Sequence, residues 1–235
     1  MSVIRYKRIK STSDTAKLLA SRGATDWTVV VSEAQTGGRG RTGKRWESRK
    51  GGLWFSVILH PRIPPGKVPL LQFVTSNAIR RAIVEKAGVR IWTKWPNDLV
   101  TETGKLAGIL VESNVKADNV SFAVVGIGIN VNQGKDELLP GATSVHTISH
   151  HKHSLEGLMN RIVENMKSRY DELDNPAVLL KEWWTGCIHR SKQVEVQTGN
   201  GIVKGVSTGV DLDGSLLVQT EKGAERVVEG TLRVL

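Results

Sequence analysis

A glycine- and arginine-rich segment at residues 37–43, GGRGRTG, constrains the fold of this chain more than any other feature. It carries the spacing G-x-G-x-x-G after a run of β-branched residues, which first suggests a dinucleotide-binding turn. Such a turn must open a helix, and an acid must follow about 20 residues later. The residues after Gly43, KRWESRKGG, carry no apolar helical stripe, and no Asp or Glu lies between Ser48 and Val84. We therefore exclude a doubly wound dinucleotide-binding fold.

The same segment also lacks the G-K-[ST] ending of a P-loop. Its glycines let backbone amides approach an anion closely, and Arg39 and Arg41 add forked donors for phosphate or carboxylate oxygens. Gln35 supplies a neutral amide at the mouth of the loop. A solvated surface loop is the alternative interpretation. The interleaving of arginines with glycines, after a strand and before Trp46, favours an anion-binding loop.

The periodicity of the remaining chain predicts an α+β fold. We expect strands at 3–9, 27–34, 52–59, 91–95, 105–113 and 119–131, and helices at 11–21, 68–87, 155–173 and 176–186. From Gln193 onward, short β-rich runs are separated by Gly and Asp, which is typical of a small antiparallel barrel. We expect a mixed β-sheet covered by helices in residues 1–188, followed by a small β-domain in residues 189–235.

Composition limits the class of protein and its compartment. Hydrophobic residues make up 39% of the 235-residue chain, and no apolar run reaches the roughly 18 residues that a membrane span requires. The N-terminal segment MSVIRYKRIK lacks the apolar core of a signal peptide. The single Cys187 excludes an internal disulfide and fits a reducing compartment, so we expect a cytoplasmic protein. A buried structural thiol is favoured over a catalytic one.

The charge of the chain points to an anionic partner. The formal net charge is +10, and residues 192–235 carry five Lys/Arg against six Asp/Glu, so the first 191 residues carry +11. Residues 35–50 hold six of those cations against Glu47 alone. The basic character is therefore concentrated around the glycine-rich segment.

Two further motifs combine a cation with tightly turning or small residues. In KWPND, residues 94–98, Lys94 and Asp98 flank a Pro-Asn turn, and Asp98 could hold Mg²⁺ or a sugar hydroxyl; a plain turn is the alternative. In GKLAGILVE, Lys105 opens a strand and is followed by small residues, so its ammonium can point into a cavity with a backbone floor. A lysine at a strand edge with its ammonium in solvent is the alternative there.

The remaining motifs are a glycine-containing strand and a histidine cluster. GIGIN, residues 126–130, places Gly126 and Gly128 in a strand, which weakens it unless something packs on the backbone, and ends it at Asn130. HHKH, residues 150–153, has no Cys and no second ligand cluster, so we interpret it as a solvated loop.

These motifs occur in order over about a hundred residues, and together they resemble the biotin protein ligases. Gln35 with GRGRTGKRW, KWPND, KLAGILVE and GIGIN carry the resemblance, and the C-terminal β segment is similar to that family's SH3-like domain. The resemblance implies a catalytic domain of the class II aminoacyl-tRNA-synthetase-like type. It also implies an ATP-dependent ligase that forms biotinyl-5′-AMP and transfers biotin to a lysine of a biotin carboxyl carrier protein.

The resemblance further assigns expected roles to single residues. Lys105 and Arg39 are the expected catalytic cations. The expected biotin contacts are Ser11, Thr12, Ser13, Gln35, Gly38, Arg39, Gly40, Arg41, Lys105, Gly108 and Gly128. The expected nucleotide contacts are Arg39, Arg41, Trp46, Lys94, Asn97, Asp98 and Asn130. Ser13 stands where the family has Asn. Mg²⁺ is expected to arrive with ATP, and Asp98 is the one candidate protein ligand.

The resemblance also bears on partners and on competing functions. It implies an acidic carrier domain and a homodimer, with no membrane association. The chain starts at the catalytic segment, so a DNA-binding domain and repression of transcription are not expected. A lipoate–protein ligase or octanoyltransferase, which shares the fold, is the second interpretation. A non-enzymatic nucleic-acid-binding protein is the third, although two Tyr and three Phe offer few stacking surfaces beside the seven Trp.

Overall fold

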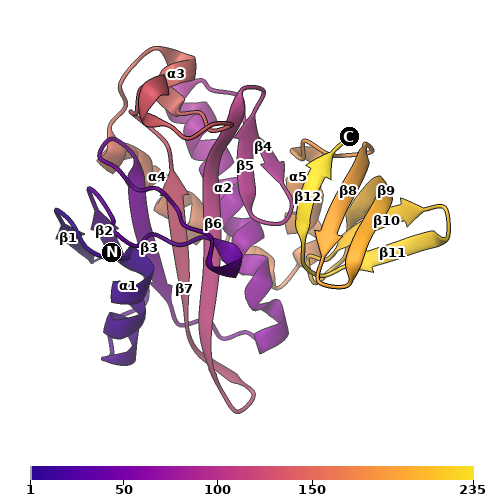
Figure 1. The fold of residues 1–235 in the computed structure, drawn as a ribbon. Helices are drawn as coiled ribbons and strands as arrows, with labels where there is room; N and C mark the ends of the chain where they lie inside the picture. The colour runs from indigo at the N-terminus through magenta and orange to yellow at the C-terminus, as the bar shows by residue number, and fades with distance from the viewer. Residues whose placement is uncertain (1) are drawn as a thin grey trace.

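The structure, a computed structural model, describes residues 2–235 as two β-sheets with helices packed on the first (Figure 1). The strands of the first sheet are β1 (Val3–Tyr6), β2 (Thr28–Ser32), β3 (Leu53–Leu59), β4 (Trp92–Lys94), β5 (Asp98–Thr101), β6 (Gly104–Lys116) and β7 (Asn119–Ile129). The helices are α1 (Thr12–Ser21), α2 (Leu71–Ala87), α3 (Val145–Ser149), α4 (Leu155–Ser168) and α5 (Pro176–Thr185). The strands of the second sheet are β8 (Gln193–Thr198), β9 (Gly201–Val210), β10 (Leu216–Thr220), β11 (Gly223–Val227) and β12 (Thr231–Val234).

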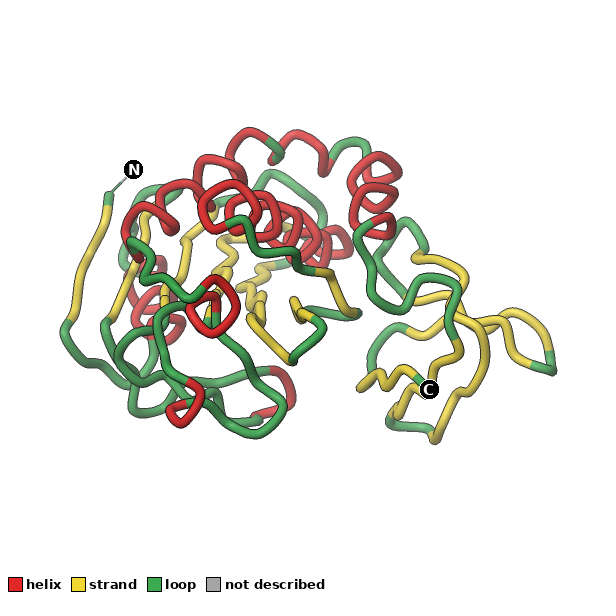
Figure 2. Tube along the Cα trace, turned by 90° about the horizontal axis from the view of Figure 1, so that it is seen from above, coloured by secondary structure: helices red, strands yellow, loops and turns green. Residues whose placement is uncertain are grey.

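The first sheet is mixed, as the sequence predicts. Its strand order is β1-β2-β3-β7-β6-β5-β4, with β1 parallel to β2 and every other neighbouring pair antiparallel. The long strands β6 and β7, which contain the strands expected at 105–113 and 119–131, are adjacent and antiparallel. Seen from above, most of the helical chain lies on one side of the strands, and loops with short helical turns lie on the other (Figure 2).

Alternating residues of the central strands pack into two different apolar clusters. Val57 and Val125 belong to the large core that includes α2 and α4, whereas Ile58 and Val124 belong to a small cluster with α1. Because successive side chains of a strand point to opposite faces, the two clusters lie on opposite sides of the sheet. We call the side of α2 and α4 the core face and the side of α1 the site face.

The α2 helix shows how the core face is covered. One apolar stripe of the segment is completely buried, namely Leu70, Leu71, Val74, Ala78, Ala82 and Ile83. The α-helix starts at Leu71 and not at residue 68, because Pro69 lies in a 3₁₀ turn over Pro65–Leu70 and has no N–H for an α-helical ladder. It ends at Gly88, which adopts a left-handed backbone with φ of 64°.

Several elements differ from the expectation. The strand expected at 3–9 ends at Tyr6, and the helix expected at 155–173 ends at Ser168 before a 3₁₀ turn. The expectation missed β5, α3 and β12, each of which has five residues or fewer. Short elements of this kind carry too few residues for a periodic pattern to register. No helix of the described residues is long and apolar enough to cross a membrane.

The C-terminal residues form a five-stranded antiparallel sheet with the order β11-β10-β9-β8-β12 (Figure 1). His189 joins it to the first sheet: its Nε2 accepts a hydrogen bond from the Trp95 backbone N–H at 3.1 Å, and its Nδ1 lies 2.8 Å from Ser207 Oγ. The backbone bond fixes the neutral tautomer with the proton on Nδ1. Burial, together with the charges of Lys94 and Lys192, lowers the pKa of His189 to about 3.

Candidate functional site

A cavity of about 600 Å³ lies between the site face, the glycine-rich segment, residues 137–142 and the C-terminal sheet. It brings together nearly all of the expected site residues from five separate stretches of sequence. Those that line it are Ser11, Thr12, Ser13, Gln35, Arg39, Gly40, Arg41, Trp46, Lys94, Asn97, Asp98, Lys105, Gly108, Gly128 and Asn130. Gly38 is absent from the lining. A Cβ at that position would lie 2.6 Å from the Trp46 carbonyl oxygen, so Gly38 allows the segment to close on itself.

The floor of the cavity is one row of residues across the sheet. The strand registers place Lys94 opposite Asp98, Asp98 opposite Gly108, Gly108 opposite Gly128, and Gly128 opposite Trp54. Directly opposed residues of antiparallel strands point to the same face. The row therefore carries charge at one end, bare backbone in the middle and an aromatic ring at the other end.

Trp46 lies on the bare part of this floor. A Cβ added to Gly128 would lie 2.5 Å from Trp46 Nε1, and one added to Gly108 would lie 3.0 Å from its Cζ3. The ring also meets Trp54 edge-on, with 6.4 Å between centroids. Its buried Nε1–H has no hydrogen-bond partner, which is costly for a buried donor. The indole therefore covers the bare part of the floor, and its one donor is buried against the sheet.

Lys105 points into the cavity because β6 contains a bulge. The register with β5 shifts between Leu99 and Val100, so that Val100 pairs with Lys105 and Leu99 with Ala107. The extra residue turns Lys105 to the same face as Gly108, although strict alternation would put residues three apart on opposite faces. Lys105 Nζ lies 2.7 Å from Asp98 Oδ1 and 5.1 Å from the centroid of the Trp46 ring.

The other end of the cavity is lined by hydroxyl and carboxamide groups. Ser11 caps α1 by accepting from the Asp14 backbone N–H at 3.3 Å. Gln35 Oε1 accepts from the backbone N–H and the hydroxyl of Thr12, at 2.7 Å and 3.1 Å. Ser56 Oγ lies 3.1 Å from Ser13 Oγ and 2.8 Å from Thr12 Oγ1. These groups form a compact polar wall whose hydroxyls can both donate and accept.

The glycine-rich segment is an ordered hairpin over residues 35–48. Its backbone is tied by Gln35 N–H to Ser48 O at 2.9 Å, Gly40 N–H to Lys44 O at 2.7 Å, and Trp46 N–H to Gly38 O at 2.9 Å. A 3₁₀ turn over Arg41–Gly43 forms its tip. The hairpin carries both Arg39 and Trp46 over the sheet, one on each side of its tip.

The C-terminal sheet forms the far wall of the cavity. At the tip of the hairpin, Arg41 Nη1 donates to Gly230 O at 3.5 Å. Burial lowers the pKa of Arg41, and the nearby carboxylates of Glu229 and Asp98 oppose that shift. Burial likewise lowers the pKa of Lys94, which Asp98 opposes. The cavity thus contains partly desolvated cations, whose attraction for an anion is stronger than in bulk water.

Two of the expected nucleotide contacts already hold backbone. Asn97 Nδ2 donates to Ile109 O at 2.6 Å, and Asn130 Nδ2 donates to Thr143 O at 3.0 Å. The Asn130 bond fixes the segment that supplies residues 137–142 to the cavity rim. Both carboxamides therefore use their N–H groups to hold the backbone of the cavity walls.

Comparison with protein families identifies the chain. Residues 6–130 match the biotin/lipoate A/B protein ligase family, and residues 192–231 match the biotin protein ligase C-terminal domain. A bifunctional ligase/repressor BirA of Bacillus spizizenii is 35% identical over 96% of this chain and 72% of its own length. The chain belongs to the biotin protein ligase family.

A solved structure matches the whole chain, and a relative of similar length matches most of it. The structure of the biotin protein ligase from Aquifex aeolicus in complex with biotin and ATP matches with a TM-score of 0.85 and 26% identity, over 100% of this chain and 99% of that one. The biotin–[acetyl-CoA-carboxylase] ligase of Paracoccus denitrificans is 28% identical over 91% of this chain and 92% of its own length. Both similarities extend through the C-terminal sheet as well as the cavity.

The structure also places near the site three residues to which the sequence analysis assigned no site role. Gly126 pairs with Leu110 on the site face, and a Cβ there would lie 2.5 Å from Ser13 Oγ. Glu112 contacts Arg39, and Glu229 faces Arg41 from the C-terminal sheet. Only Gly126 carries a local signal, as a glycine inside a strand. The two acids are brought in by tertiary contacts that no local pattern reports.

Neither Cys187 nor the HHKH segment has the surroundings of a catalytic or metal-binding site in the described residues. Cys187 is buried, and burial raises the pKa of its thiol to about 12, which suits a structural thiol and not a nucleophile. Among the described residues, no group of three or more His, Cys, Asp or Glu side chains could hold a metal ion. His153 of the HHKH segment instead bonds Ser149 Oγ at 2.7 Å.

Proposed function

We propose that this biotin ligase forms biotinyl-5′-AMP from biotin and ATP in the hairpin-covered cavity and transfers biotin to a lysine of a biotin carboxyl carrier protein. The observation that carries the proposal is the union in one cavity of a polar wall, a bare glycine floor and the desolvated cations. Biotin has a polar ureido ring and an anionic carboxylate at opposite ends of an apolar chain. The cavity offers a matching polarity from Gln35 to Lys105.

We assign the polar wall to the biotin ring. Ser11, Thr12, Ser13 and Gln35 supply hydroxyl and carboxamide groups for the ureido N–H and C=O groups. Ser13 takes the place of the family's Asn with a shorter side chain, and the buried Ser56 supports it with a hydroxyl 3.1 Å from Ser13 Oγ. Trp46, which lies on the floor at Gly108 and Gly128, then bounds the space for the apolar part of the ligand.

We assign to the cations the stabilisation of the negative charge that develops during adenylate formation. In the first step a biotin carboxylate oxygen attacks the α-phosphorus of ATP and pyrophosphate leaves. Two anions must approach each other, so Lys105 and Arg39 would stabilise the transition state electrostatically. Lys105 would exchange Asp98 for the ligand, while Arg41 and Lys94 would contact the phosphates. Trp46, Asn97 and Asn130 would form the nucleotide side of the cavity.

We assign Mg²⁺ to the nucleotide. A carboxylate oxygen is a ligand that Mg²⁺ prefers, and Asp98 offers one at the charged end of the floor. One carboxylate fits a metal that is carried in by phosphates and holds most of its other ligands from them and from water. Bound Mg²⁺ would neutralise phosphate charge.

In the second step the ε-amine of the acceptor lysine attacks the carbonyl carbon of the mixed anhydride and AMP leaves. The hairpin would shield the anhydride from water until that amine arrives. The net charge of +10 suits an acidic carrier domain, and Arg45, Arg49 and Lys50 expose their cations on the hairpin and next to it. We further infer a homodimer, a cytoplasmic location, and folding units at residues 1–188 and 189–235.

Biotin-dependent exchange of pyrophosphate into ATP by the purified chain with Mg²⁺ tests this function. Exchange with biotin, and not with lipoate or octanoate in parallel, is the expected result. The polar wall at the end of the cavity and the biotin ligase C-terminal domain favour biotin over these aliphatic acids. Exchange with lipoate would make the chain a lipoate ligase. No exchange with any of the three acids would contradict the ligase assignment and direct attention to nucleic-acid binding.

A further inference from the structure

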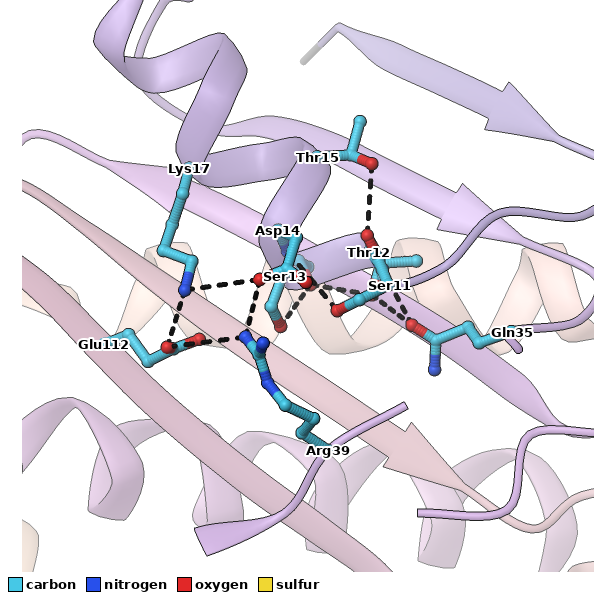
Figure 3. A network of polar contacts seen from close by, with 10 residues as sticks. Ser11, Thr12, Ser13, Asp14, Thr15, Lys17, Gln35, Arg39 and Glu112 are labelled. Atoms are coloured by element: carbon cyan, nitrogen blue, oxygen red, sulfur yellow. Dashed lines mark hydrogen bonds and ion pairs between the residues drawn. The ribbon is translucent and has the colours of Figure 1, made fainter. Parts of the chain in front are cut away.

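A network of two carboxylates and two cations lies beside the cavity, on the side of α1 (Figure 3). Arg39 Nη2 lies 2.5 Å from Asp14 Oδ1 and 3.8 Å from Glu112 Oε1. Lys17 Nζ lies 2.7 Å from Glu112 Oε1 and 3.4 Å from Asp14 Oδ1. Each carboxylate therefore faces both cations.

Three of the four residues belong to regular secondary structure. Asp14 lies in the first turn of α1, and Lys17 lies one turn later on the same side of the helix. Glu112 lies in β6, opposite Val124 and hence on the site face. Arg39 alone comes from the hairpin. The helix and the sheet thus present a preformed acidic receptor, and the hairpin inserts a cation into it.

The charge balance of this receptor requires Arg39. Without it, two carboxylates would face the single ammonium of Lys17. Their side chains are 32% and 28% exposed, so water screens them only in part, and the Oε2 atom of Glu112 is buried with no hydrogen-bond partner. Like charges that are partly desolvated repel each other more strongly than exposed ones. The receptor is therefore stable when a second cation occupies it.

Arg39 is also placed where the hairpin has few other anchors. The base of the hairpin is tied to the chain by Thr36 and Gly37, whose backbone N–H groups donate to Ile9 and Lys10. Beyond Gly38, Arg39 and Arg41 make the hydrogen bonds and ion pairs that join the hairpin to distant parts of the described chain, and the ring of Trp46 adds a contact with Lys105. The acidic receptor fixes the middle of the strand that leads to the tip.

We propose that Asp14 and Glu112 are positioning residues for the ligation reaction: they hold Arg39 and so fix the hairpin over the cavity. A guanidinium has five N–H donors in a planar fork. The carboxylates engage the Nη2 end, which leaves other donors of the fork directed to an anion in the cavity. The role in catalysis rests on the function proposed above, whereas the anchoring of the hairpin does not.

The test compares Asp14→Asn, Glu112→Gln and the double variant with Glu85→Gln as a matched control. Glu85 forms an ion pair with Arg161 at 2.8 Å, away from the hairpin. In the ligand-free protein, hydrogen–deuterium exchange of residues 38–46 is expected to accelerate severalfold in the Asp14 and Glu112 variants and to stay at the wild-type rate in the control. Unchanged exchange in the double variant, with the protein folded, would overturn the proposal.

The second measurement is the rate at which preformed biotinyl-5′-AMP leaves the enzyme, alongside kcat and KM for biotin in pyrophosphate exchange. The double variant is expected to release the adenylate on the order of tenfold faster, and in an Arg39→Ala background the same substitutions are expected to change nothing. A purely structural role would lower Tm without this dependence on Arg39. Equal effects in both backgrounds would overturn the positioning role, whereas a wild-type enzyme without biotin exchange would overturn the function alone.

Discussion

The two faces of the central sheet use the same strands for opposite purposes. On the core face, Phe55, Val57 and Val125 are completely buried and pack under α2 and α4. On the site face, the same strands carry Gly126 and Gly128, whose bare backbone leaves room for Ser13 and for the ring of Trp46. Function on one face thus depends on side chains that are missing, and stability on the other depends on side chains that fill space.

The largest expected effect is a loss of activity on the site face. Lys105→Ala removes the cation closest to Asp98 and is expected to slow adenylate formation by about 10²–10³-fold, the usual cost of removing one group that stabilises transition-state charge. Tm is expected to stay near the wild-type value because the Lys105 side chain is 39% exposed. Pyrophosphate exchange measures the first quantity. Lys204→Ala, which breaks an ion pair with Glu195 on the C-terminal sheet, is the control.

Full exchange activity in Lys105→Ala would contradict the assignment of Lys105 as the catalytic cation. The charged end of the cavity floor would then have no demonstrated catalytic role on the site face, and Lys94 would be the next residue to test.

The second effect concerns a buried titratable group on the core side of the molecule. His189 is neutral in the fold, with a pKa lowered to about 3, whereas an unfolded histidine titrates near 6.5. The unfolded chain therefore binds more protons between these values, and stability falls as the pH falls below about 6.5. Between pH 7 and pH 4 the expected loss is about 3 kcal/mol, at about 1.36 kcal/mol per pH unit.

Urea unfolding at several pH values measures this loss. His189→Gln keeps an acceptor for the Trp95 N–H but cannot titrate, so its stability is expected to change less with pH than that of the wild type. Parallel pH profiles for the two proteins would show that His189 does not titrate on unfolding.

The third effect is a crossed pair of substitutions on one strand. Gly128→Ala puts a Cβ 2.5 Å from Trp46 Nε1, so the indole must move by about 1 Å, which is expected to slow adenylate formation on the order of 10²-fold. Val125→Ala, on the opposite face of β7, is expected to lower the free energy of unfolding by about 2 kcal/mol and to leave the exchange rate unchanged. Exchange kinetics and urea unfolding of both variants would reveal whether activity depends on the site face and stability on the core face. If each variant lost both activity and stability, the two faces would not have separate roles.

Local patterns in the sequence predict the site face only in part. Local sequence context is enough to single out the glycines at 108 and 128, the polar run at 11–13 and the hairpin arginines. All of these residues line the cavity. The cavity-facing direction of Lys105 is expected from the small residues that follow it, but the bulge in β6 that produces this direction is not, because strict alternation places Lys105 on the face opposite Gly108.

Contacts between distant elements are the other part that sequence reasoning could not supply. Arg39 and Glu112 are 73 positions apart, and Arg41 and Gly230 are 189 apart. Their proximity follows from the order of strands and from the docking of the C-terminal sheet through His189. Periodicity reports which face a residue occupies within its own element, and it carries no information on which element will lie across from it.

The smallest expected effect distinguishes the covering hairpin from the floor beneath it. Arg41→Gly removes a cation from the cavity and the contact of the hairpin tip with Gly230 O, while the floor stays intact. Adenylate formation is therefore expected to continue, with release of biotinyl-5′-AMP about tenfold faster, a change that corresponds to about 1.4 kcal/mol. The released anhydride would biotinylate lysines of an added bystander protein, which an avidin blot measures.

Lys50→Ala, which removes an exposed cation that pairs with Glu33 just outside the hairpin, is the control for this prediction. If Arg41→Gly retained the adenylate as tightly as the wild type, the hairpin would cover the cavity without holding its contents, and retention would belong to the floor and the polar wall.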